Sequence, residues 1–260
     1  MNDTDKCDES LGAPDAKVVQ VQDIKAEKPL MICGFPSSGL VGTIAANTII
    51  EQFDMKEVAF LRSKFIPSAA VFLEGQLKHP FRIHASDEHN LIVVTAEVPV
   101  AQQGMYHVSS CLLDWAKSQG VQETVILDGI PVRGMPSDRK VLYASEVEKM
   151  KELSEGNELE MLKKGIITGV AGSILSETLS REMTGFALLT PAVAVMPDPK
   201  GASMVLKALA KLYDVDIDVS ELEDQAEDIR KRLREMAEQV DGMRKQQAQS
   251  QGEEFERLYA

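Results

Sequence analysis

Short apolar runs and stretches of helical spacing alternate along most of the chain. Short apolar runs bounded by turn residues predict β-strands. They cover residues 30–33, 58–61, 70–73, 81–84, 91–96, 124–127, 140–143 and 186–191. Apolar residues that recur every three or four positions predict amphipathic helices. These cover residues 40–50, 104–118, 145–153 and 201–212.

The order of these elements predicts the fold class. The strand 30–33 leads through the turn Gly34-Phe35-Pro36 into a helix, and the helix 104–118 leads into the strand 124–127. Continuous apolar strands that alternate with amphipathic helices are typical of a layered sheet with both faces buried. The pattern therefore predicts an α/β fold, and we expect one domain over residues 28–219.

A different pattern begins at Ser220. Ser220 and Glu223 have the spacing of a capping box, which marks the start of a helix. The apolar positions that follow repeat with the spacing of a coiled-coil seam. They are Leu222, Ala226, Ile229, Leu233, Met236, Val240 and Met243. The sequence predicts an amphipathic helix over residues 220–245, which either packs on its own body or forms a coiled coil with another copy.

Residues 246–260 predict a flexible tail that ends in a docking tripeptide. Residues 246–252 lack a seam and are mostly glutamine, which favours a flexible spacer. The last three residues are Leu258, Tyr259 and Ala260. An apolar side chain, a tyrosine hydroxyl and a free carboxylate suit a pocket with an apolar wall and a cationic group. The alternative is a frayed terminus without function.

Negative charge is concentrated at the two ends of the chain. The protein has 260 residues and a net charge of -13. Residues 1–27 carry seven acidic and three basic side chains, and residues 214–260 carry fourteen and seven, which leaves twenty and eighteen for the body. We expect residues 1–27 to be a disordered acidic leader that ends in a short strand. Nucleic-acid partners are excluded, because phosphate binding depends on clustered lysine and arginine.

Apolar content and cysteine usage indicate the compartment. No apolar run approaches the roughly 20 residues that a membrane-spanning helix needs, and the acidic N-terminus does not resemble a signal peptide. Three cysteines, Cys7, Cys33 and Cys111, form no C-x-x-C pair. A scattered, odd set of cysteines fits a reducing compartment. We therefore expect a cytoplasmic protein with no membrane partner.

Four motifs occur in a fixed order along the chain. They are Gly34-Phe35-Pro36-x-x-Gly39-Leu40-Val41-Gly42, the glycine-rich segment 165–172, Pro197-Asp198-Pro199-x-x-Ala202, and Asp216-Ile217-Asp218 followed by Leu222. Together they resemble the archaeal and bacterial proteasome assembly chaperone family over about residues 28–230. This resemblance implies a three-layer α/β/α body, related to the phosphorylase/hydrolase-like folds, and homo-oligomerisation.

The resemblance extends to the end of the chain. Archaeal members of the family end in a hydrophobic-Tyr-any tripeptide (the HbYX motif), which Leu258-Tyr259-Ala260 matches. Proteasome activators insert such tails into pockets between adjacent α subunits of the 20S ring, where a lysine meets the terminal carboxylate. The resemblance thus implies a non-enzymatic chaperone whose partners are 20S proteasome α subunits and which uses no cofactor.

An enzyme of the phosphorylase/hydrolase-like group is the alternative. A glycine-rich turn between a strand and a helix exposes N–H groups that can hold a small anionic or nucleoside ligand. The residues that would line this pocket are Gly34, Ser37, Ser38, Gly39 and Asp128, with Arg133 and Arg139 nearby. The turn does not match a P-loop, because Leu40-Val41 stands where Lys-Ser/Thr is required. We favour a packing role for the glycines.

Other polar residues predict no catalytic or metal site. His79, His84 and His89 are spaced by five, which matches no familiar zinc spacing, so we expect no metal. Asp198 lies between two prolines, and we interpret it as the cap or turn residue of the following helix.

Overall fold

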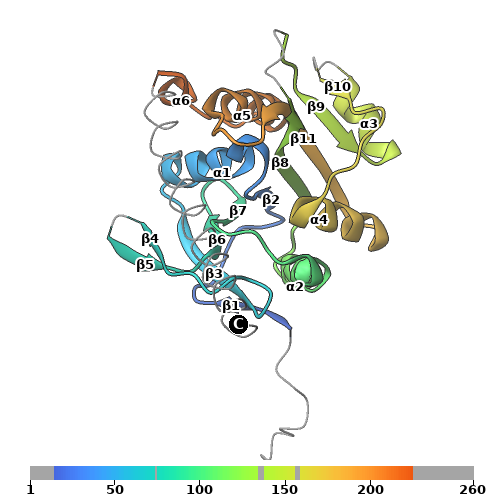
Figure 1. The fold of residues 1–260 in the computed structure, drawn as a ribbon. Coiled ribbons are helices and arrows are strands. Elements are labelled where there is room, and N and C mark those ends of the chain that lie inside the picture. Colours follow the sequence, from blue (N-terminus) through green and yellow to red (C-terminus); the bar gives the residue numbers. More distant parts are fainter. Residues whose placement is uncertain (1–14, 74, 134–137, 156–158, 225–260) are drawn as a thin grey trace, which may run out of the picture.

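A computed structural model of the chain shows one large sheet with helices on both faces (Figure 1). The structure describes residues 15–73, 75–133, 138–155 and 159–224. Within these ranges nine strands form the sheet in the order β1-β3-β6-β7-β2-β8-β11-β9-β10. A separate hairpin consists of β4 (Val71–Leu73) and β5 (Gln76–Lys78).

The middle of the sheet is parallel. Its strands are β7 (Leu91–Ala96), β2 (Leu30–Gly34), β8 (Glu123–Val132) and β11 (Thr184–Val193). Antiparallel pairing adds β6 (Phe81–Ser86), β3 (Lys56–Ser63) and β1 (Ala16–Gln20) on one side, and β9 (Leu142–Ser145) on the other. The short β10 (Glu160–Met161) runs parallel to β9 at the edge. The predicted strands are confirmed, but the strand predicted over 124–127 continues through Asp128 to Val132, because β11 pairs with it over its whole length.

Helices cover the two faces of the sheet and complete three layers. One face carries α1 (Val41–Gln52) and α5 (Pro199–Tyr213), and the other carries α2 (Met105–Ser118) and α4 (Gly169–Ser180). Shorter elements are α3 (Val147–Ser154), α6 (Ser220–Asp224), η1 (Ser38–Leu40) and η2 (Gln102–Gly104). The predicted three-layer α/β/α class is therefore confirmed.

Alternation along the strands divides the core into two clusters. Met31 and Cys33 of β2 belong to the cluster under α2 and α4, whereas Ile32 belongs to the cluster under α1 and α5. Successive side chains of a strand point to opposite faces, so a fully apolar strand must be covered twice. Continuous apolar runs in the sequence reflect this double burial.

The N-terminal strand belongs to the body. β1 includes part of the strand expected near residues 18–21, and it pairs antiparallel with β3 from Ala16 to Gln20. The sheet therefore begins before the predicted domain boundary at residue 28.

The helix predicted at Ser220 is present, but its predicted capping box is wrong. Asp218 Oδ1 accepts hydrogen bonds from the Ser220 backbone N–H at 2.9 Å and from the Ser220 hydroxyl at 2.6 Å. Glu223 Oε1 instead accepts from Ser203 Oγ at 3.0 Å and from Lys207 Nζ at 2.9 Å. The glutamate therefore binds α6 to α5. Residues 225–245 of the predicted helix lie outside the described residues.

Candidate functional site

The turn after β2 is held close to the sheet by glycines. A Cβ atom on Gly34 would lie 2.0 Å from the carbonyl oxygen of Gly42, and one on Gly42 would lie 2.2 Å from that of Leu127. Neither distance is possible for a real side chain, so α1 packs directly on the backbones of β2 and β8. Gly39 has a φ of 67°, which favours glycine. These contacts support the packing role expected for the glycines.

Ser37 and Asp128 lie together at the carboxyl edge of the parallel strands. Asp128 is 8% exposed, and its Oδ1 accepts a hydrogen bond from the Ser37 hydroxyl and one from the Gly129 N–H at 2.7 Å. Burial raises the pKa of Asp128, and the hydrogen bonds from Ser37 and Gly129 oppose that rise. The structure thus brings together two of the five residues predicted to line a pocket.

Backbone contacts occupy the rest of the turn. The Gly39 carbonyl accepts a hydrogen bond from the Asp198 N–H at 2.8 Å, and Gly39 itself is buried. A Cβ atom on Gly129 would lie 2.1 Å from the carbonyl oxygen of Ser38. The turn therefore packs against β8 and against the start of α5. The turn is thus a close-packed junction beside the buried carboxyl group of Asp128.

A second buried aspartate, Asp198, lies beside this junction. Its Oδ1 accepts from the Gly201 N–H at 2.9 Å, which confirms the predicted cap of α5. The Arg139 guanidinium spans both carboxylate oxygens, with Nη1 3.1 Å from Oδ1 and Nη2 2.8 Å from Oδ2. Arg139 was expected near Asp128, and its pairing with Asp198 was missed. No local signal links two residues that are 59 positions apart.

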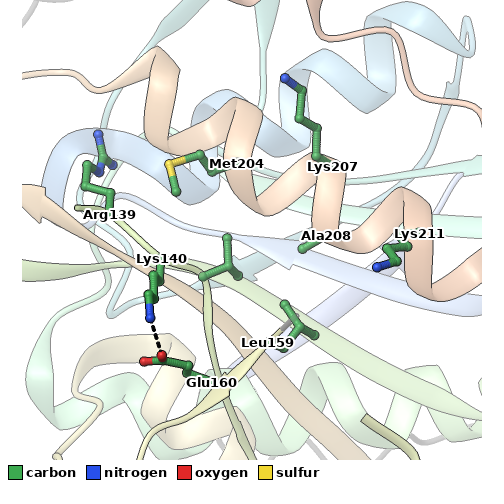
Figure 2. Close-up of a pocket in the computed structure, with 9 residues that line it drawn as sticks. Arg139, Lys140, Leu159, Glu160, Met204, Lys207, Ala208 and Lys211 are labelled. Carbon is green, nitrogen blue, oxygen red and sulfur yellow. Dashed lines mark hydrogen bonds and ion pairs between the residues drawn. The ribbon is translucent and has the colours of Figure 1, made fainter. Parts of the chain in front are cut away.

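A cavity of about 500 Å³ lies between α5 and the edge of the sheet at β10, and Figure 2 shows the residues around it. They are Arg139, Lys140, Val141, Leu159, Glu160, Met204, Lys207, Ala208 and Lys211. Lys140 forms an ion pair with Glu160 across the cavity rim. None of the five predicted pocket residues lines this cavity, so it is separate from the Ser37–Asp128 pair.

His79, His84 and His89 make separate contacts within the described residues. His79 stacks on Phe60 with ring centroids 3.6 Å apart, and His89 stacks on Phe53 at 4.1 Å. Burial and the nearby Arg82 lower the pKa of His84 to about 4. Within the described ranges, no group of three or more histidine, cysteine or acidic side chains is arranged to hold a metal ion.

Comparison with known proteins identifies the family. The sequence pattern of the PAC2 family matches residues 31–237. The chain belongs to the PAC2 family. This match includes all four motifs that carry the resemblance to proteasome assembly chaperones. The junction formed by Gly34, Gly42 and Asp198 is therefore part of the PAC2 body.

Three solved structures are similar over most of the PAC2 body. Pyrococcus furiosus PbaA, an archaeal homologue of proteasome-assembly chaperone, is 28% identical, with a TM-score of 0.79 over 88% of this chain and 99% of that chain. A Thermoplasma acidophilum protein of unknown function is 33% identical, with a TM-score of 0.78 over 85% and 91%. P. furiosus PbaB, an archaeal proteasome activator, is 27% identical, with a TM-score of 0.73 over 86% and 99%.

The predicted docking residues of this PAC2 protein, Leu258, Tyr259 and Ala260, lie outside the described residues. In the part of the chain that the structure describes, no helix is both long and apolar enough to cross a membrane.

Proposed function

We propose that this protein is a proteasome assembly chaperone that binds the α ring of the 20S proteasome through Leu258, Tyr259 and Ala260. The observation that carries the proposal is the likeness to P. furiosus PbaA, which extends over 99% of that chain. The likeness to PbaB, an archaeal proteasome activator, supports the same class of partner. The hydrophobic-Tyr-any tripeptide supplies the contact with the α ring.

Each residue of the tripeptide has a distinct part in the proposed contact. Leu258 fills an apolar wall, Tyr259 buries its ring and donates its hydroxyl, and the carboxylate of Ala260 pairs with a lysine of the α subunit. Several tails on one homo-oligomer would engage several pockets of one ring. Tails that are weak individually then gain affinity through their effective concentration.

We propose that the body has a binding role and performs no bond chemistry. The close packing of the turn supports this proposal, because Gly39 is buried and its carbonyl accepts a hydrogen bond from the Asp198 N–H at the start of α5. The proposed chaperone acts in the cytoplasm, as a homo-oligomer without a cofactor.

The affinity of the full-length protein for archaeal 20S particles tests the tail contact. Tyr259→Ala should weaken binding by about 2 kcal/mol, the loss typical of an interface hot spot. Phe255→Ala is the matched control, since it removes an aromatic ring from the same tail outside the tripeptide. Equal losses in both variants, or no loss with Tyr259→Ala, would contradict the proposal.

The alternative function is an enzyme that binds a small anionic or nucleoside ligand at the turn. One observation favours it, namely that Ser37 donates a hydrogen bond to the buried Asp128. Thermal unfolding in the presence of phosphate, nucleosides and nucleotides tests this alternative. A ligand at 100 times its Kd would stabilise the folded protein by about 2.7 kcal/mol. We expect no stabilisation, and a ligand whose effect disappears in Asp128→Asn would favour the enzyme.

A further inference from the structure

Apolar side chains are exposed at the turn between β11 and α5. Val195 is 82% exposed and Met196 is 41% exposed. Lys200 follows in the first turn of α5, is also exposed, and lies near enough to Glu223 to contribute to lowering the pKa of that carboxyl. The turn lies at the carboxyl edge of β11, next to the Gly39–Asp198 contact. This edge therefore has two apolar groups and one cation available to a further segment.

The direction of α5 across the sheet is fixed at both of its ends. At its beginning, the Asp198 N–H binds the Gly39 carbonyl at the carboxyl edge. At its end, the Tyr213 hydroxyl donates to Glu123, the first residue of β8, at the opposite edge. α5 therefore runs from the carboxyl edge of the parallel strands to their amino edge, and α1 runs in the same direction.

The chain then turns back toward the carboxyl edge. Gln52, at the end of α1, donates to the Asp216 carbonyl at 3.2 Å and accepts from the Asp218 N–H at 3.0 Å. Five residues later, Glu223 accepts from Ser203 and Lys207 in the middle of α5. The segment from Asp216 to Glu223 therefore runs antiparallel to α5. Its helix, α6, lies beside α5 (Figure 1).

The first residue of the predicted seam is already buried in its own body. Leu222 is 5% exposed and belongs to the core cluster under α1 and α5. The neighbouring charges also match, because Glu221, Glu223 and Asp224 belong to α6, which packs beside the helix that carries Lys200 and Lys207. In the sequence, residues 225–228 add two acidic and no basic side chains. Both observations favour packing on the body over a coiled coil for the beginning of this helix.

We propose that the helix continues beyond Asp224, antiparallel to α5, and that Ile229 and Leu233 of the same chain cover Val195 and Met196. One helical turn advances the chain by about 5.4 Å, so Glu227 follows Glu223 toward the start of α5 and pairs with Lys200. The next seam position, Ile229, then reaches the β11–α5 turn. This inference does not depend on proteasome binding.

The proposed packing limits where the C-terminal segment leaves the body. The helix would depart from the carboxyl edge of the sheet, beside the β11–α5 turn. Only the later seam residues, Met236, Val240 and Met243, would remain available to a second copy. A short coiled coil at the end of the helix therefore stays compatible with packing at its beginning.

Disulfide trapping in the full-length chain tests the proposal. In a background with Cys7→Ser and Cys111→Ser, where the buried Cys33 remains, Met196→Cys is combined with Ile229→Cys. The control combines Met196→Cys with Lys231→Cys, which lies on the other side of the helix. Because a disulfide needs Cα atoms within about 6 Å, we expect the first pair to close at least about tenfold faster under mild oxidation.

Equal closure of the two pairs would overturn the proposal. Mixing isotope-labelled and unlabelled copies before oxidation shows whether the disulfide joins residues of one chain or of two. Disulfides found mainly between two copies would overturn the assignment of the helix to the same chain. A second measurement needs no substitution, namely the rate at which Lys200 and Lys211 are acylated in the natural chain. Lys200 should react several-fold more slowly than Lys211. Equal rates would contradict the Glu227–Lys200 pair.

Discussion

Asp128 and Asp198 lie at the same edge of the sheet, and both are buried. The Asp198 carboxylate is paired with the Arg139 guanidinium through two contacts, and it also caps the start of α5. Asp128 accepts hydrogen bonds from the Ser37 hydroxyl and the Gly129 N–H, but within the described residues no cation contacts it. The Asp198 carboxylate joins the start of α5 to the segment before β9, whereas burial disfavours the charged form of Asp128.

The largest effect should follow from removing the cation of the Asp198 pair. Arg139→Ala leaves a buried carboxylate without its partner, and we expect it to lower the free energy of unfolding by about 3–5 kcal/mol. Urea denaturation measures this change. Arg139→Lys is the control and should lose less, because a single ammonium keeps the charge but not the two parallel contacts. A loss below about 1 kcal/mol for Arg139→Ala would show that the pair does not hold the edge together.

A smaller loss should follow from disturbing the backbone beside Asp128. Gly129→Ala places a Cβ atom 2.1 Å from the Ser38 carbonyl oxygen, which belongs to the backbone and cannot rotate away. We expect a destabilisation of about 1–3 kcal/mol, the usual range for overpacking. Thermal denaturation checks this value, and an unchanged transition would mean that η1 has room to move.

Removing the hydroxyl that binds Asp128 should have the next effect. Ser37→Ala deletes a donor to a buried carboxyl group, and we expect a loss of about 1–2 kcal/mol at neutral pH. The pKa of Asp128 should rise further, because the Ser37 hydrogen bond lowers it. The loss should therefore shrink at acidic pH, where the carboxyl group is protonated. A loss that is independent of pH would contradict this account.

The smallest effect concerns the charge of Asp128 itself. Burial raises the pKa of this carboxyl in the folded state above its ordinary value of 3.8. At pH values between the ordinary pKa and the raised pKa, the folded state binds more protons than the unfolded state. The contribution of Asp128 to stability therefore falls as pH rises. Asp128→Asn keeps the acceptor oxygen and should remove this fall. The measurement is the free energy of unfolding of the natural protein and of Asp128→Asn from pH 3 to pH 7. Parallel curves for these two proteins would show that the charge of Asp128 does not affect stability.

Local patterns predicted most of the elements because the central strands β2, β7, β8 and β11 are buried on both faces. The run Leu30–Gly34 is apolar at every position before its glycine, since Ile32 faces one cluster and Met31 and Cys33 face the other. The cap at Asp198 was also predictable, because prolines on both sides restrict the backbone where a helix begins. These signals act over a few residues.

Interactions between distant residues were not predictable from the same patterns. Glu223 has the spacing of a capping box, but Lys207 and Ser203 attract its carboxylate across two helices. Arg139 precedes β9, and only the insertion of β9 beside β11 brings it to Asp198. A single sequence records neither the strand order nor the charge that will face a given side chain. Ser37 and Asp128 do lie together as the pocket hypothesis expects, but Asp128 lies within β8 and not after its end.

The central claim is tail-dependent binding to the proteasome. Native mass spectrometry of purified archaeal 20S particles and α rings, mixed with the full-length protein and with a version that lacks Leu258, Tyr259 and Ala260, tests it most directly. The account predicts complexes with the full-length protein and none with the shortened version, while both versions keep the same oligomeric state. Equal binding by both versions, or no binding by either, would contradict the claim.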